Sequence, residues 1–180
     1  MTSTDLPDRR TSGPTPRGLR IRGATRADRT ELAGLLRGLS LESSYRRFQT
    51  GLGPEPPPAV LDALLPEGLR GAAVLAYVGS ALVGHGLWVR AGATPVAEIG
   101  LIVADDHQGR GIGTALARGL MADLGAHGVE RVEVFASVTN EPVIRMVRRQ
   151  APDAVAEPDG ATVTYSFATP VLARAVRPVA

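Results

Sequence analysis

The sequence predicts a mixed α/β fold, in which helices cover the faces of one central sheet. Three observations predict this class. Strand-like and helix-like periodicities alternate in the order β-α-α-β-β-β-α-β-α-β. A two-residue Gly79-Ser80 turn joins two apolar runs as a hairpin. Finally, three alternate glycines (Gly109, Gly111 and Gly113) lie between a strand pattern and a helix pattern.

The size and composition of the chain narrow the choice of protein class. Its 180 residues suit a single domain, and 44% hydrophobic with 21% charged residues excludes wholesale disorder. No apolar run approaches the ~20 residues of a membrane span, and no signal peptide is visible. We therefore expect a cytoplasmic protein with no membrane partner. The absence of cysteine excludes disulfides, thiol nucleophiles and Cys-ligated zinc.

The charge of the chain gives little support to nucleic-acid binding. All 20 basic residues are arginine, and the formal net charge is only +2. Arginine stays protonated far above neutral pH, so a high isoelectric point does not indicate a basic surface. Two explanations of the missing lysines stay open: the codon bias of a GC-rich genome, or a protein that avoids being its own amine substrate.

The pattern divides the chain into a flexible tail (1–18), one domain (19–168) and a C-terminal tail (169–180). Thr25 to Asp28 resembles a capping box, and four leucines spaced for one face follow it in a helix. An Asp159-Gly160 turn precedes the last strand. The other expected elements are strand 19–22, helices 40–48 and 59–65, strands 72–78, 81–90 and 96–103, helix 112–125, strand 129–136, helix 140–149 and strand 161–167.

The stretch from Glu98 to Leu116 carries the chemistry. Its glycines permit positive φ angles and a close approach of the backbone. The N–H groups that open the following helix have no internal partners, so this loop predicts a phosphate cradle. A P-loop would need a lysine, and a dinucleotide fingerprint would need a glycine at Leu116 and an earlier place in the chain. A Rossmann-type nucleotide-binding module is thus a minor alternative.

The pattern Gln108-x-x-Gly111-x-Gly113, between a strand and a helix, resembles the pyrophosphate-binding signature of the general N-acetyltransferase (GNAT) superfamily. The resemblance implies a mostly antiparallel mixed sheet with helices on both faces. It also implies acetyl-CoA as co-substrate, no metal and an amine acceptor. Leu39 to Phe48 resembles the acceptor-side helix of bacterial protein-lysine acetyltransferases, although ordinary packing with a solvated arginine face also explains it. The acceptor, a protein lysine or a small-molecule amine, and a possible homodimer stay open.

The resemblance assigns the donor site residue by residue. The strand backbone before the loop would pair with the pantetheine arm, and the cradle amides would hold the pyrophosphate. Arg110 would add charge to a phosphate or remain a solvated loop residue. Asn140 would contact the cofactor, cap the last helix, or do both. The implied cofactor-binding residues are Leu101, Ile102, Val103, Gln108, Gly109, Arg110, Gly111, Ile112, Gly113, Thr114 and Asn140.

Glu98 is the candidate general base, because it is the only charge in an apolar strand. A partly desolvated carboxylate there would have a pKa suited to accepting an ammonium proton; a structural role is the alternative. Val147 stands where many members of the superfamily have a tyrosine that protonates the thiolate. The expected function is therefore direct acetyl transfer to an amine, and the alternative is a non-catalytic acyl-CoA-binding regulatory module. His85 and His107 lack partners at metal-ligand spacing, so no metal site is expected.

Overall fold

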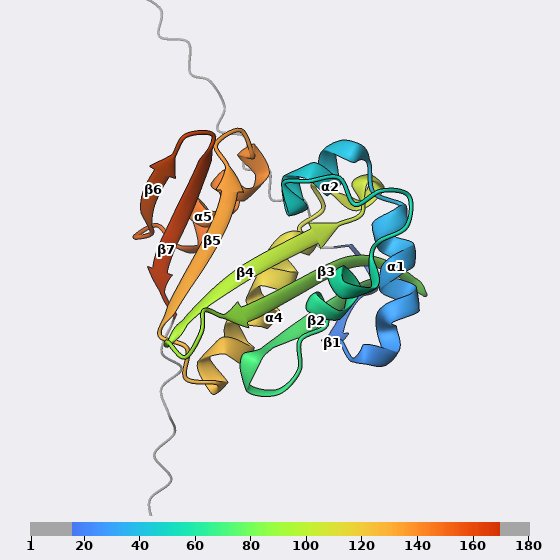
Figure 1. Cartoon of the computed structure of the whole chain (residues 1–180), viewed down its shortest axis with the longest axis horizontal. Helices are drawn as coiled ribbons and strands as arrows, with labels where there is room; N and C mark the ends of the chain where they lie inside the picture. The colour runs from blue at the N-terminus through green and yellow to red at the C-terminus, as the bar shows by residue number, and fades with distance from the viewer. Residues whose placement is uncertain (1–15, 170–180) are drawn as a thin grey trace, which may run out of the picture.

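The computed structural model describes residues 16–169, which build a seven-stranded sheet in the order β1-β2-β3-β4-β5-β7-β6 (Figure 1). All neighbouring strands pair antiparallel except β4 and β5, which run parallel. The predicted mixed, mostly antiparallel sheet is confirmed. The strands are β1 Leu19–Gly23, β2 Gly71–Val78, β3 Ala81–Arg90, β4 Val96–Val103, β5 Arg131–Ser137, β6 Val155–Asp159 and β7 Thr162–Ala168.

The helices cover both faces of this sheet, with α1 and α3 on one side and α4 and α5 on the other (Figure 1). The α-helices are α1 Arg29–Arg37, α2 Leu41–Phe48, α3 Pro58–Ala63, α4 Ile112–Ala126 and α5 Glu141–Gln150. Short 3₁₀ turns occupy Arg26–Asp28, Gly68–Arg70 and Asp105–His107. The predicted capping box at Thr25 thus opens a 3₁₀ turn, and α1 follows directly from it.

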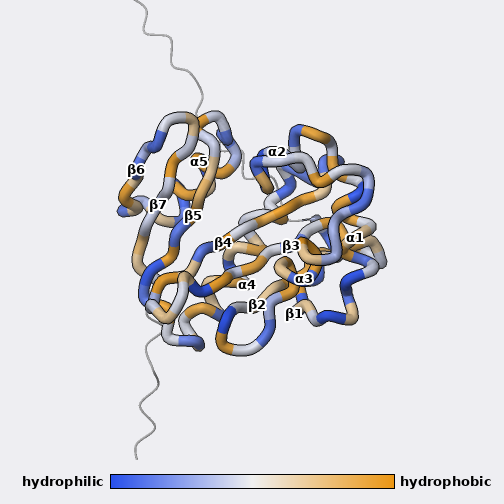
Figure 2. The backbone as a smooth tube through the Cα atoms, in the orientation of Figure 1, coloured by the Kyte–Doolittle hydropathy of each residue, from blue (hydrophilic) through white to orange (hydrophobic). Residues whose placement is uncertain are grey.

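Two layers of apolar side chains hold the helices on the sheet. Leucines of α1 and α3 pack with Leu87 and Ile102 on one face. Leucines of α4 pack with Trp88 and Val132 on the other, and Figure 2 shows apolar stretches along these central elements. Successive strand residues alternate between the two faces. Glu98, four residues before Ile102 on β4, therefore lies on the face that α1 covers.

The sheet opens between its two parallel strands. β4 and β5 pair only at Val96 with Arg131, Ala97 with Val132 and Glu98 with Glu133. Beyond Glu98 the two strands diverge, as Figure 1 shows, and β5 continues in its pairing with β7. The rest of β4 keeps β3 on one edge and offers free backbone N–H and C=O groups on the other.

The structure contains one strand more than the sequence pattern predicted. β6 was missed because all its residues are exposed, which leaves no alternation between buried and exposed positions. The predicted Asp159-Gly160 turn joins β6 to β7. Of the predicted N-terminal tail, residues 1–15 lie outside the described residues, as does 170–180 at the other end. Thr169 is buried, and its amide donates to the carbonyl of Glu130 at 2.9 Å.

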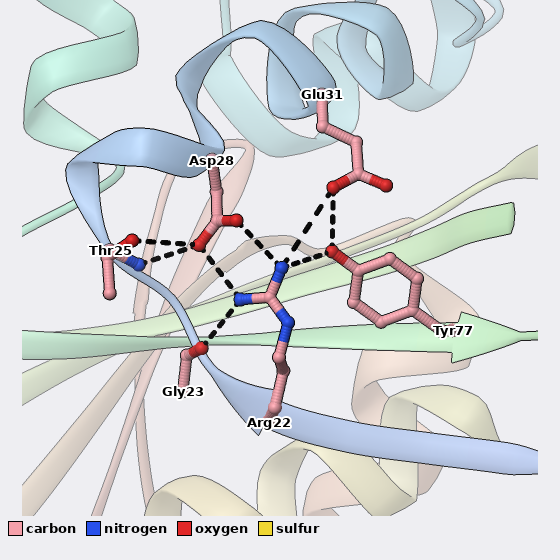
Figure 3. Close-up of polar contacts among 6 residues, drawn as sticks. All are labelled: Arg22, Gly23, Thr25, Asp28, Glu31 and Tyr77. Carbon is pink, nitrogen blue, oxygen red and sulfur yellow. Dashed lines mark hydrogen bonds and ion pairs between the residues drawn. The ribbon is translucent and has the colours of Figure 1, made fainter. Parts of the chain in front are cut away.

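A cluster of four polar side chains ties β1 to the start of α1 (Figure 3). The Arg22 guanidinium donates to both carboxylate oxygens of Asp28, at 2.9 and 2.7 Å, and to the Tyr77 hydroxyl at 2.7 Å. The Tyr77 hydroxyl donates in turn to Glu31 at 2.8 Å. Chiefly through its hydrogen bonds to Arg22, Asp28 has a pKa lowered to about 2. The ionised form of Asp28 therefore stabilises this edge of the fold.

We expect Asp28→Asn to lower the free energy of unfolding at pH 7 by about 1–2 kcal/mol, because the folded state favours the ionised carboxylate. This stabilisation is present above the ordinary carboxyl pKa and disappears as the pH falls from about 4 towards 2. Urea unfolding at pH 7, 4 and 2.5 measures it. The control Asp62→Asn removes the half-exposed partner of Arg29 and should cost less than about 1 kcal/mol. Equal losses in both variants at pH 7 would contradict the role of Asp28.

Candidate functional site

A large cleft opens where β4 leaves β5. Its cavity volume is about 1260 Å³. Pockets for drug-sized ligands usually measure about 300–1,000 Å³, so this cleft has room for a long ligand and a second molecule. Its walls come from α2, β4, the loop before α4, α4 itself, β5 and α5.

The cleft brings together almost all of the residues singled out from the sequence. They come from segments that lie far apart in the chain and meet only in the fold. Arg110 is the exception: its side chain is exposed and does not line the cleft. The predicted residues that line it are Glu98, Leu101, Ile102, Val103, Gln108, Gly109, Gly111, Ile112, Gly113, Thr114 and Asn140.

The glycines of the cradle meet two different requirements. Gly109 and Gly111 have φ angles of 71° and 77°, a region that side chains rarely adopt. Gly113 lies in the first turn of α4 with ordinary helical geometry. A Cβ at Gly113 would meet only Val103, at 3.9 Å, so the protein itself leaves this space open. The first two glycines shape the loop, and the third leaves its surface bare beside the unpaired N–H groups of α4.

Gln108 and Asp105 attach the N-terminus of α2 to this loop. The Gln108 side-chain amide donates to the Ser43 hydroxyl at 3.0 Å and to the Val103 carbonyl at 3.1 Å. The Asp105 carboxylate accepts from the Ser40 amide (2.9 Å), the Ser40 hydroxyl (2.8 Å) and the Ser43 hydroxyl (2.6 Å). Burial raises the pKa of Asp105, but these hydrogen bonds outweigh it and lower the pKa overall. The side chain of Gln108 thus joins two walls of the cleft.

Asn140 and Val147 lie on the α5 side of the cleft. The Asn140 side chain accepts a hydrogen bond from the Val143 amide at 3.4 Å. Asn140 therefore caps the N-terminus of α5, which was one of its two expected roles. Val147 is buried and packs with Ile144 and Val163. This position therefore offers no proton donor to the cleft.

Glu98 lies on the last paired rung before β4 and β5 diverge. Its carboxylate is exposed, in contrast to the partly desolvated group that the sequence suggested. Its partner in the register is Glu133 of β5, which does not itself line the cleft. Glu133 could not be singled out from the sequence, because only the register of the parallel pair places it beside Glu98.

Arg47 is the second residue that sequence reasoning missed. Its guanidinium lies against Gly100 of β4, where any Cβ would collide with it. Its Nε atom is buried and finds no hydrogen-bond partner among residues 16–169, while the guanidinium lies over the Phe48 ring, 5.3 Å from the centroid. Burial lowers the pKa of Arg47, and the nearby Glu98 carboxylate partly opposes this effect. Two sequence signals were available: Gly100, a glycine in the middle of an apolar strand, and the stretch from Leu39 to Phe48, whose arginines ordinary packing explained as a solvated face.

Positive charge dominates the cleft. Five arginines line it, against the two carboxylates Glu98 and Asp153. Such a surface favours a ligand that carries several negative charges. The arginines are Arg46, Arg47, Arg118, Arg145 and Arg149.

The described residues contain no group of three His, Asp or Glu side chains that could hold a metal ion. His85 is fully buried, and its Nε2 lies 2.8 Å from the Leu64 carbonyl, as a donor in that tautomer. Burial lowers the pKa of His85 to about 4. Between residues 16 and 169, no helix is long and apolar enough to cross a membrane.

A diverging parallel pair beside a glycine cradle at a helix N-terminus defines an acyltransferase fold and cleft. The model of the acetyltransferase (GNAT) family matches residues 39–151, and the chain belongs to this family. No curated protein sequence matches the chain significantly.

Solved structures share the fold at low sequence identity. The GNAT domain of S. lividans PAT is 22% identical with a TM-score of 0.75, over 83% of this chain and 90% of that one. The putative acetyltransferase yncA from Salmonella typhimurium, solved with its cofactor acetyl-CoA, is 14% identical (TM-score 0.64; 87% and 97% covered). The paia N-acetyltransferase from Thermoplasma acidophilum, in complex with coenzyme A, is 15% identical (TM-score 0.61; 83% and 98% covered).

We expect Asp105→Ala to loosen α2, because three donors at its N-terminus lose their acceptor. The free energy of unfolding should fall by about 1 kcal/mol. Amide hydrogen exchange in α2 should become at least about fivefold faster, while α4 keeps its protection. Asp106→Ala is the matched control, since the neighbouring Asp106 is exposed and makes no hydrogen bond or ion pair within residues 16–169. Equal exchange of α2 in both variants would show that Asp105 does not hold this helix.

Proposed function

We propose that the protein is an N-acetyltransferase that moves the acetyl group of acetyl-CoA directly to a primary amine, either a protein lysine or a small molecule. The observation that carries this proposal is the cleft itself. It joins a free strand edge, a bare glycine cradle and an exposed carboxylate in one continuous space. Membership of the family and the two neighbours solved with acetyl-CoA or coenzyme A support it.

In this proposal the donor lies along β4 from the cradle towards Glu98. Backbone amides from Gly109 to Thr114 bind the pyrophosphate at the positive end of α4. The free edge of Leu101, Ile102 and Val103 pairs with the amides of the pantetheine arm. Arg118, exposed on the cleft wall one turn further along α4, supplies additional positive charge for the phosphates.

The chemical step needs a neutral amine and a stabilised oxyanion. Glu98 accepts the ammonium proton, directly or through water, and the amine nitrogen attacks the thioester carbonyl. A backbone N–H of the diverging β4 edge polarises the carbonyl oxygen. A C–N bond forms, the C–S bond breaks, and the thiolate takes a proton from solvent because Val147 has none to give.

The apolar Val147 also favours a second candidate, an acyl-CoA-binding regulatory module without turnover. Calorimetric titration with acetyl-CoA, beside an assay of free-thiol release over an amine panel, separates the two. Micromolar binding with thiol release supports the enzyme, whereas binding without release supports the module. The absence of binding would contradict both.

Gly113→Ala should weaken acetyl-CoA binding at least about tenfold, because its methyl group occupies the space left for the pyrophosphate. The same change should raise the free energy of unfolding slightly, since alanine is the better helix former by about 1 kcal/mol. Calorimetry and thermal unfolding measure the two effects. The matched control is Gly119→Ala on the same helix, outside the cleft, where a Cβ would meet only Ile21 at 3.8 Å. Equal affinities of both variants for acetyl-CoA would refute the cradle.

Glu98→Gln should lower kcat/KM near neutral pH by about 10²-fold, as the loss of a general base usually does. The affinity for acetyl-CoA should change little, so the loss lies in the chemical step. The measurement is a pH–rate profile by thiol release. Glu130→Gln removes the same charge outside the cleft and serves as the control. An unchanged profile in Glu98→Gln would remove Glu98 from the mechanism.

A further inference from the structure

Arg47 carries a partly buried positive charge that no carboxylate of the described residues pairs with. Its guanidinium lies over the Phe48 ring, 5.3 Å from the ring centroid, but forms no hydrogen bond and no ion pair within 4.0 Å among residues 16–169, although Glu98 is close enough to affect it electrostatically. A desolvated charge without an anionic partner costs free energy, and a local carboxylate would have reduced that cost. The position of Arg47 in the cleft wall therefore suggests that a bound molecule supplies the missing anion.

The place of Arg47 along β4 separates it from the phosphates of the donor. Val103 lies beside the cradle, where it contacts Gln108 and faces Gly113. Arg47 lies against Gly100, three residues or roughly 10 Å further along the strand. It thus stands towards the closed end of the cleft, where the transfer takes place, rather than at the cradle.

Glu98 and Gly100 lie on the same face of β4, two residues or about 7 Å apart. The Glu98 carboxylate of the strand and the Arg47 guanidinium of α2 therefore lie near each other on this face of β4. An ammonium fits the carboxylate, and an anionic group on the same or the adjacent carbon of that molecule reaches the guanidinium.

We infer that the acceptor is a small amine that also carries a carboxylate, with its ammonium at Glu98 and its carboxylate on Arg47. This inference rests on the proposed function and names the acceptor class for that site. Phe135 of β5, with 48% of its surface exposed, also lines the cleft and offers an apolar contact to a side chain. An amino acid with an apolar side chain combines all three features, whereas a lysine within a polypeptide lacks the carboxylate.

The test compares leucine, leucinamide and isoamylamine as acceptors, beside a lysine-containing peptide, in the thiol-release assay on the full chain. We expect the wild type to prefer leucine over leucinamide at least about tenfold in kcat/KM. Arg47→Met should reduce this ratio at least tenfold, mainly through the KM for leucine, and Arg47→Lys should restore part of it. The control Arg46→Met should keep the wild-type ratio, because Arg46 already pairs with Glu42. Thermal unfolding confirms that each variant is folded.

Four results would overturn the inference. The first is equal use of leucine and leucinamide, or a preference for the peptide. The second is a leucine preference that survives Arg47→Met. The third is an Arg47-dependent preference for succinyl-CoA over acetyl-CoA, which would place the anion on the donor. The fourth is acetyl-CoA binding without transfer to any of these amines. If the wild type binds no acetyl-CoA at all, that result contradicts the proposed function and not this inference alone.

Discussion

The limited pairing of β4 with β5 is the constraint on which the rest of the structure depends. Three residue pairs join the strands before they part. Had the ladder continued, β4 would have had no free edge, and the space that now forms the cleft would be filled by sheet. Because β5 instead stays with β7, the sheet holds together on both sides of the opening. The opening exposes the backbone of β4 without exposing its apolar side chains, which remain packed under α1 and α4.

A second set of interactions links α2 to the loop that follows β4. Asp105 and Gln108 follow β4 directly, and both bind the first turn of α2. α2 in turn carries Arg47 over Gly100. One short loop therefore forms the cradle and also anchors the helix that carries the guanidinium. Asp105 therefore holds the N-terminus of α2, although its place beside the glycines would suggest a role in phosphate binding.

The sequence predicted those parts of the molecule that depend on local pattern. The apolar runs of β2, β3 and β4 and the leucine face of α4 follow from burial, and Gly109 and Gly111 follow from backbone conformation. β6 escaped prediction because an exposed edge strand has no buried side to mark it. Arg47 and Glu133 escaped because their places depend on contacts between segments that lie about 35 to 53 residues apart in the chain. Arg110 lies within the cradle, but its exposed side chain does not line the cleft, which agrees with the solvated-loop alternative, and its role in phosphate binding stays a prediction.

The unsatisfied charge of Arg47 also bears on stability. A partly desolvated cation that has no anionic partner in the described part of the chain lowers the stability of the free protein, and the small Gly100 below it gives up packing to make room. Neither feature benefits the fold by itself. A ligand that brings an anion to this point relieves the cost in the bound state alone, so part of its binding free energy comes from strain already present in the free protein.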